Sequence, residues 1–168
     1  ANIMKMTDGL FINCAEEIHS VEYPNIEYES VIIDAGCMKM VQDPSQFDML
    51  LLENLYGDVV SDLCAGLVGG LGLVPGANIG DQGAVFEAVH GSAPDIAGKN
   101  VANPLALLMS AVMMLNHIGD TQKNPGAQAV AQKIKNAYNQ AMADGCKTRD
   151  LGGELNSDAF ADALIERL

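Results

Sequence analysis

Residues 63–80 form a run without a charged side chain, and the run contains six glycines and Pro75. Its length approaches that of a membrane-spanning helix, but glycine and proline make a helix exposed to lipid improbable. We therefore expect no membrane span and a long turn-rich connection over residues 69–83. The glycines near Gly69 also favour a crossing between two domains, residues 1–68 and residues 69–168.

Helical and strand-like patterns alternate along the chain, which predicts an α/β fold. Apolar residues at helical spacing predict helices at residues 7–20, 35–44, 55–67, 103–119, 124–145 and 156–168, the second of them ended by Pro44. Asn103, Asn124 and Asn156 are expected to cap the last three. Strand-like patterns occupy residues 26–34, 47–54 and 84–90.

Acidic residues outnumber basic ones by 22 to 9, which gives a formal net charge of −13. Such a charge repels nucleic-acid phosphates and anionic membranes, so we expect neither as a partner. The four cysteines show no CxxC pair or metal-finger spacing. We expect reduced core thiols in a soluble intracellular protein.

Asp58 and Asp62 stand four residues apart in a predicted helix, which places both carboxylates on one face. Two like charges there favour a hard divalent cation between them, although a solvated acidic face has the same pattern. Asp34 ends a predicted strand, where an acid is well placed to join a site or to cap the next helix.

The segment HGSAPDIAGKN, residues 90–100, combines glycines, one proline and the acid Asp95. Its peptide N–H groups can face a phosphate, but it matches neither the Rossmann G-x-G-x-x-G pattern nor a Walker loop. A plain surface turn is the alternative. In a nucleotide loop, an acid accepts hydrogen bonds from a ribose 2′-hydroxyl and repels a 2′-phosphate, which favours NAD over NADP.

Three motifs together resemble the C-terminal half of the isocitrate and 3-isopropylmalate dehydrogenases, which are metal-dependent β-decarboxylating enzymes. They are NLYGDVVSDLCAGLVGGLG (residues 54–72), FEAVHGSAPDIAGKNVANPLALLMSAVMML (residues 86–115) and DLGG (residues 150–153). The resemblance runs nearly end to end and implies the C-terminal portion of that family's fold, which is not a Rossmann fold. The first motif and NIG at residues 78–80 are more similar to NAD-dependent isocitrate dehydrogenases.

The resemblance implies a role for individual residues. Asp34, Asp58 and Asp62 would bind Mg²⁺ or Mn²⁺, with Asp34 contributed across a dimer interface, so residues 1–68 would belong to a small dimerisation and metal-binding domain. Residues 69–168 would return to a large dinucleotide-binding domain. Asn54 and Glu87 would lie toward the nicotinamide ribose. The adenosine end of NAD would be held by His90, Gly91, Ser92, Ala93, Asp95, Ile96 and Asn103.

The implied activity is oxidative decarboxylation of isocitrate to 2-oxoglutarate with reduction of NAD, in a homodimer or higher oligomer. The family's catalytic lysine immediately precedes the segment that begins this sequence, and its catalytic tyrosine also lies outside, so we expect the 168 residues alone to be inactive. The alternatives are a 3-isopropylmalate dehydrogenase, an acidic interaction module without a nucleotide site, and a non-catalytic regulatory subunit. We expect the cytoplasm, with the mitochondrial matrix as the alternative.

Overall fold

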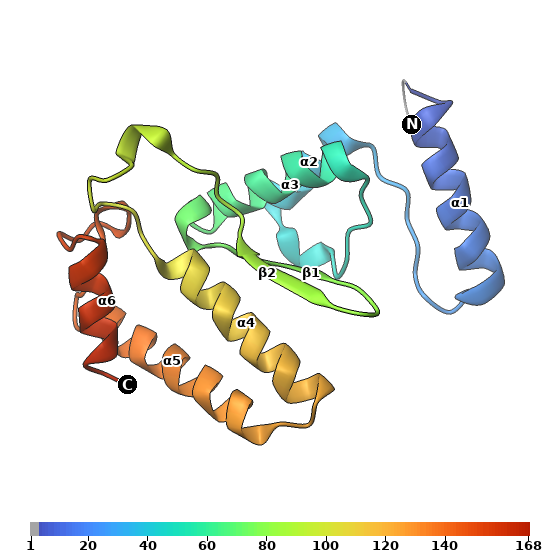
Figure 1. The fold of residues 1–168 in the computed structure, drawn as a ribbon. Helices are drawn as coiled ribbons and strands as arrows, with labels where there is room; N and C mark the ends of the chain where they lie inside the picture. The colour runs from blue at the N-terminus through green and yellow to red at the C-terminus, as the bar shows by residue number, and fades with distance from the viewer. Residues whose placement is uncertain (1–3) are drawn as a thin grey trace. The chain divides into compact units, whose positions relative to one another are not determined.

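The computed structural model describes residues 4–168 and separates them into two compact units, one ending at Leu67 and one spanning Val68–Leu168 (Figure 1). Each unit is described by itself. Within residues 4–168, no helix has both the length and the apolar character needed to cross a membrane.

The first unit consists of three helices, α1 (Thr7–Glu22), α2 (Ile33–Gln42) and α3 (Asn54–Leu67). All three confirm helices predicted from the sequence. Helices α2 and α3 pack together and bury Met40, Val60 and Ala65. After α2 comes the short 3₁₀ turn η1 (Pro44–Gln46), which Asp43 caps by accepting a hydrogen bond from the Ser45 amide at 3.1 Å. Proline cannot continue the helix, so α2 ends where expected.

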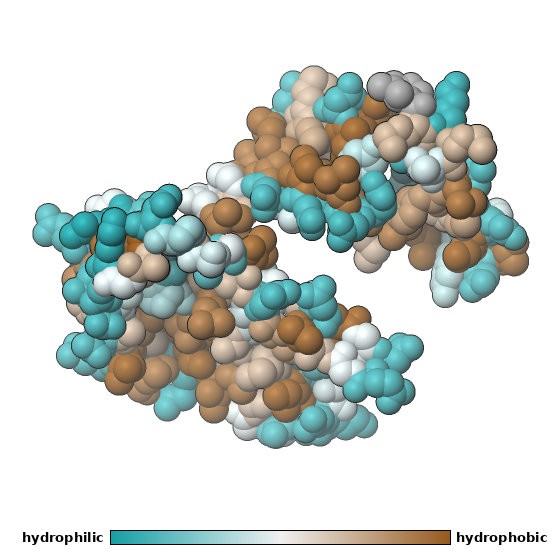
Figure 2. All heavy atoms as spheres, turned by 45° about the horizontal axis from the view of Figure 1, so that its top comes forward, coloured by the Kyte–Doolittle hydropathy of each residue, from teal (hydrophilic) through white to brown (hydrophobic). Residues whose placement is uncertain are grey.

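The predicted strands at residues 26–34 and 47–54 are wrong. Residues 27–32 have no regular structure, α2 begins at Ile33, and residues 48–53 are irregular. Met49 is 88% exposed and Leu51 is 66% exposed. A strand needs a neighbour to accept and donate its backbone hydrogen bonds. Among residues 4–168, neither segment has such a neighbour, and part of the apolar pattern remains exposed. Figure 2 shows that hydrophobic residues reach the molecular surface in several places.

The second unit begins with the 3₁₀ turn η2 (Leu71–Leu73) and an antiparallel hairpin of β1 (Pro75–Ile79) and β2 (Ala84–Ala88). Strand β2 confirms the prediction at residues 84–90. Strand β1 corrects the expectation of a turn-rich connection over residues 69–83. The sequence did not predict this strand because it begins with Pro75 and Gly76, and both residue types are depleted in strands. Pro75 pairs with Ala88 at the open end, and the Gly80 amide donates to the Gly83 carbonyl at 2.9 Å in the turn.

Three further helices complete this unit and confirm the last three predicted helices: α4 (Leu105–Thr121), α5 (Pro125–Ala143) and α6 (Ser157–Ile165). Their core includes Leu105, Ala141, Phe160 and Leu164. The Asn124 side chain caps α5 by accepting from the amides of Gly126 and Ala127, and Asn156 caps α6 by accepting from Ala159. Two more 3₁₀ turns, η3 (Pro94–Ile96) and η4 (Arg149–Leu151), precede α4 and α6.

The cysteines are all free thiols, but the expectation of four core residues is wrong for one of them. Cys14 is exposed on α1, and the other three are half-buried. Cys64 lies 3.1 Å from the Met40 sulfur, sulfur to sulfur, which ties it to the α2–α3 core. Cys14 is exposed because α1 buries little of its surface in this unit, where Asp8 is its one buried residue.

Candidate functional site

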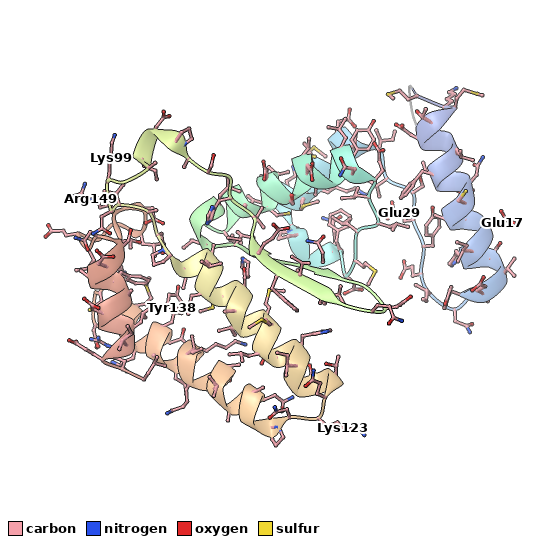
Figure 3. All side chains as sticks on the ribbon, viewed as in Figure 1. Glu17, Glu29, Lys99, Lys123, Tyr138 and Arg149 are labelled. Atoms are coloured by element: carbon pink, nitrogen blue, oxygen red, sulfur yellow. The ribbon has the colours of Figure 1, made fainter. Side chains whose placement is uncertain are left out.

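The β2–α4 loop, residues 89–104, carries most of the residues expected to bind the cofactor. Its tip is shaped by short-range hydrogen bonds, from the Ile96 amide to the Ala93 carbonyl at 3.1 Å and from Lys99 to Ile96 at 3.1 Å. Lys99, labelled in Figure 3, marks the end of this tip. Gly98 and two residues that are not glycine, Ala93 and Asn100, have positive φ angles of 73°, 43° and 54°. Residues 91–100 are all exposed, so the peptide groups of the tip face solvent or a ligand.

Asp95 lies in the turn η3 at this tip. Its carboxylate is exposed and makes no hydrogen bond or ion pair with any residue from 4 to 168. Ile96 beside it is 39% exposed. His90, at the start of the tip, is occupied locally, because its Nδ1 lies 3.0 Å from the Gly91 carbonyl oxygen. Asp95 is therefore an unengaged acceptor, as a ribose hydroxyl would require.

Asn103 lies near the end of the loop, and both the oxygen and the nitrogen of its side-chain amide are hydrogen-bonded. Its Oδ1 accepts from the Leu105 amide at 2.9 Å, and its Nδ2 donates to Asp150 Oδ2 at 2.9 Å. The side chain is only 9% exposed. These two contacts fix which end of the amide is oxygen and which is nitrogen. The sequence marked Asp150 only as part of the DLGG motif and did not show its contact with Asn103, which lies 47 residues earlier in the chain.

Glu87, on β2, is fixed through both its backbone and its side chain. The buried Ser110 hydroxyl donates to the Glu87 carbonyl at 2.8 Å, which joins β2 to α4. The Asn78 amide donates to Glu87 Oε1 at 3.2 Å from the neighbouring strand. Gly76 stands opposite Glu87 in the hairpin, where a Cβ would come within 3.0 Å of the Glu87 carbonyl oxygen. Sequence reasoning missed Asn78 and Ser110 because both act through this tertiary pairing.

Asp58 and Asp62 lie one turn apart on α3, and both are exposed. Neither carboxylate makes a hydrogen bond or ion pair with another residue of the described chain. Asp34 lies in the first turn of α2, where its Oδ1 accepts from the Ala35 amide at 2.6 Å. No cluster of three or more His, Cys, Asp or Glu side chains suited to a metal occurs within residues 4–168. The structure thus places two carboxylates on one helix and does not bring Asp34 to them.

The first turn of α3 is tied to α1 within the same unit. The Tyr56 hydroxyl donates to Asp8 Oδ2 at 2.9 Å, and this bond to a carboxylate raises the pKa of the tyrosine. Tyr56 lies between Asn54, the first residue of α3, and Asp58. The contact therefore fixes the end of the helix that carries two of the residues expected in a site. Its partners are 48 residues apart, so no local pattern could have shown it.

Comparison with known proteins agrees with the motifs. The family model for isocitrate/isopropylmalate dehydrogenase matches residues 1–166. A mitochondrial regulatory subunit of NAD isocitrate dehydrogenase from Dictyostelium discoideum is 52% identical across all of this chain, and the match covers 46% of that protein. Mitochondrial catalytic subunit 5 of the same enzyme from Arabidopsis thaliana is also 52% identical, with 43% of its length covered.

A solved structure has the same fold over the same region. Isocitrate dehydrogenase from Methylococcus capsulatus is 49% identical, with a TM-score of 0.86, and the match covers 99% of this chain and 48% of that one. The chain thus spans about half the length of the relatives that it matches.

Proposed function

Because this chain belongs to the isocitrate/isopropylmalate dehydrogenase family, we propose that it forms part of a longer enzyme that oxidatively decarboxylates isocitrate to 2-oxoglutarate and reduces NAD. The observation that carries the proposal is the free carboxylate of Asp95 on the exposed tip of the β2–α4 loop. A carboxylate there accepts from the adenosine ribose 2′-hydroxyl and repels the 2′-phosphate of NADP. The relatives named as NAD enzymes support the same cofactor.

The residues present fit a divalent metal in part. Asp58 and Asp62 offer oxygen ligands, which Mg²⁺ and Mn²⁺ prefer, and neither is engaged by another described residue. When bound, such an ion supplies Lewis-acid stabilisation of negative charge on substrate oxygens. The two acids would hold the ion from α3. Asp34 would complete the set from a second subunit, which is why we propose a dimer or a higher oligomer.

The β2–α4 loop would hold the adenosine end of NAD, with Asp95 on the ribose and Asn103 oriented by Asp150. Glu87, fixed by Asn78 and Ser110, would lie toward the nicotinamide ribose. The family resemblance implies the same role for Asn54. No residue from 1 to 168 is proposed to transfer a proton to the substrate. That role belongs to the lysine and tyrosine expected outside this sequence, so the 168 residues alone are expected to be inactive.

Two related functions are the alternatives to this proposal, and they differ from it in the substrate or in the role of the subunit. The family includes 3-isopropylmalate dehydrogenases, whose cofactor and metal requirements are the same by resemblance. One relative is a regulatory subunit, whereas another, equally identical, is catalytic. Retention of Asp34, Asp58 and Asp62 favours the catalytic role, because a subunit that only binds an effector does not need all three acids. Both relatives are mitochondrial, which favours the mitochondrial matrix over the cytoplasm.

The decisive experiment follows NADH formation by the longer protein with Mg²⁺ and either isocitrate or 3-isopropylmalate. We expect turnover with isocitrate and none when the metal is chelated. Absence of turnover with both substrates would refute the dehydrogenase assignment, and turnover with 3-isopropylmalate alone would reassign the substrate.

Asp95→Lys tests the cofactor assignment in the same assay. Loss of a charge-assisted hydrogen bond predicts a KM for NAD about 10- to 100-fold higher. Asp81→Lys, which makes the same charge change in the exposed β1–β2 turn, is the control and should leave that KM unchanged. An unaltered KM for NAD in Asp95→Lys would remove Asp95 from the ribose site.

A further inference from the structure

The tip of the β2–α4 loop is held to the rest of its unit only through the residues that flank it. Between His90 and Lys99, every hydrogen bond found within residues 4–168 stays inside the loop. The bonds that leave the loop come from Val89 at its start, whose amide donates to the Val74 carbonyl at 3.3 Å, and from Asn100, Ala102 and Asn103 at its end. Val89 directly follows β2, so beyond that strand the position of the tip, and with it that of Asp95, depends on what fixes Asn100, Ala102 and Asn103.

Asn100 makes its contacts with the first turn of α6. Its carbonyl oxygen accepts from the Ser157 amide at 3.1 Å, and its Oδ1 accepts from the Asp158 amide at 3.3 Å. Its Nδ2 donates to Asp158 Oδ2 at 2.8 Å. The Ser157 hydroxyl adds a hydrogen bond to the Ala102 carbonyl. We call these four bonds the loop–α6 contact.

These contacts also complete the start of α6. The first four amides of a helix lack partners inside the helix. Here Asn100 accepts from the amides of the first two helical residues, Ser157 and Asp158, and the Asn156 side chain accepts from the third, Ala159, at 2.8 Å. Two asparagines, one of them 58 residues away from Asp158, therefore share the cap of a single helix.

The backbone of Asn100 explains why one residue can do this. Its φ of 54° lies in the left-handed region, which asparagine enters more readily than most residues other than glycine. In this structure, Asn100 presents its carbonyl and its side-chain amide to the same helix end. Phe160, in the next turn of α6, is fully buried in the core of the unit. The helix end is thus a rigid support for the loop.

We propose that Asn100 and Asp158 are positioning residues for cofactor binding, acting through the loop–α6 contact to hold the tip that carries Asp95. The inference rests on the proposed function, because it assumes that the tip binds the adenosine end of NAD. It adds a role for α6, whose residues were not among those expected in the site. Asp158 itself makes no hydrogen bond to the tip within the described residues; it acts by holding Asn100.

The test uses the longer protein, with ADP-ribose as the probe of the adenosine site. In Asp158→Ala, nuclear magnetic resonance should show amides 95–99 becoming more mobile, as lower ¹⁵N heteronuclear Overhauser effects. ADP-ribose should bind about 3- to 10-fold more weakly, since a loop that is no longer preorganised has to be ordered on binding. Asn100→Gly, which keeps the left-handed backbone and removes both side-chain bonds, should have at least the same effect.

Two variants separate this role from general stability. Asp158→Asn keeps an acceptor oxygen for Asn100 and should restore both loop order and affinity. Asp162→Ala removes an exposed acid one turn later in α6 and should change neither. Thermal midpoints of all four variants show whether the unit remains folded.

Each outcome is decisive for one part of the proposal. Unchanged loop mobility in both Asp158→Ala and Asn100→Gly would overturn the holding role. Greater mobility with unchanged ADP-ribose affinity would overturn the positioning role and leave a purely structural contact. If the wild-type protein does not bind ADP-ribose, the proposed cofactor site fails, while the mobility measurements still decide whether α6 holds the loop.

Discussion

At the scale of single residues, Gly153 occupies a position in a short motif where no side chain has room. It follows Gly152, whose φ is 77°, in the DLGG segment before α6. A Cβ on Gly153 would overlap the carbonyl group of Lys147. That carbonyl accepts from the Leu155 amide at 3.0 Å, and the Gly153 amide donates to Thr148 at 2.9 Å, so the backbone cannot move apart without losing hydrogen bonds.

Gly153→Ala is therefore expected to destabilise the chain by about 1–3 kcal/mol, as forced overpacking does. Urea denaturation measures the change. Gly83→Ala is the control, because its Cβ would meet nothing within 4 Å and should cost less than about 0.5 kcal/mol. A Gly153→Ala variant as stable as Gly83→Ala would show that the segment relaxes easily.

At the scale of elements, the cap of α5 makes a measurable contribution to the folding free energy. Asn124 Oδ1 accepts from the Gly126 amide at 3.0 Å and from the Ala127 amide at 3.2 Å. Asn124→Ala should cost about 1 kcal/mol of folding free energy, the usual worth of such a cap. Asn139→Ala, an exposed position inside the same helix, should instead be neutral or slightly stabilising, because alanine is the better helix former. Equal effects from the two substitutions in chemical denaturation would contradict the capping role.

The ends of α5 and α6 are joined by an ion pair whose strength depends on pH. Arg167 Nη2 and Nε lie 2.7 Å and 3.0 Å from Asp144 Oδ2. These bonds, and one from Gln140, hold the pKa of Asp144 below its ordinary value of 3.8. A lowered carboxyl pKa means that the stabilisation is present above the ordinary value and is lost as pH falls through the lowered one.

Asp144→Asn should therefore lower the thermal midpoint at neutral pH, and the difference from wild type should shrink below the ordinary carboxyl pKa of 3.8. Both side chains are partly exposed, so the effect should be small and should weaken in high salt. Asp162→Asn serves as the comparison, since it removes an exposed acid of α6 without an ion pair. A difference between wild type and Asp144→Asn that does not vary with pH would contradict this assignment.

Helices could be predicted from the sequence because their periodicity and caps are local. Asn124 and Asn156 precede apolar residues at helical spacing, and the structure confirms both caps. The segments at residues 26–34 and 47–54 had an equally clear strand pattern, yet a strand depends on a partner that local sequence does not contain. The same limit applies to the candidate site. The exposed tip with Asp95 could be predicted, whereas the contacts of Asp150, Asn78 and Asp158 could not, because each joins residues of different structural elements.

At the scale of the whole molecule, the accessible surface of the chain is larger than that expected for two globular units of its size. Its accessible surface is 11462 Å². Two separate globular units of these sizes would expose about 9,500 Å² by the usual scaling with mass. Ile26, Ile32, Met49 and Leu51 of the first unit are each more than half exposed. Apolar exposure of this kind marks surfaces that are covered in a larger assembly or a longer chain.

The isolated 168 residues are therefore expected to bind the dye anilinonaphthalene sulfonate strongly. They are also expected to show a smaller urea m-value than a compact protein of the same length, because less surface remains to be exposed on unfolding. The longer protein should lose most of the dye signal per molecule. Dye fluorescence as weak as that of a compact monomer would contradict the prediction.

The shared cap of α6 has a consequence for synthesis in the cell. Asn100 leaves the ribosome's catalytic centre 58 residues before Asp158. At translation rates of about 5–20 residues per second, the segment that bears Asp95 waits roughly 3 to 12 seconds for the residues that hold it. Throughout that interval the nascent loop lacks its contact with α6. A premature stop before residue 157 would therefore yield a product that contains the whole loop sequence but not the residues that position the loop.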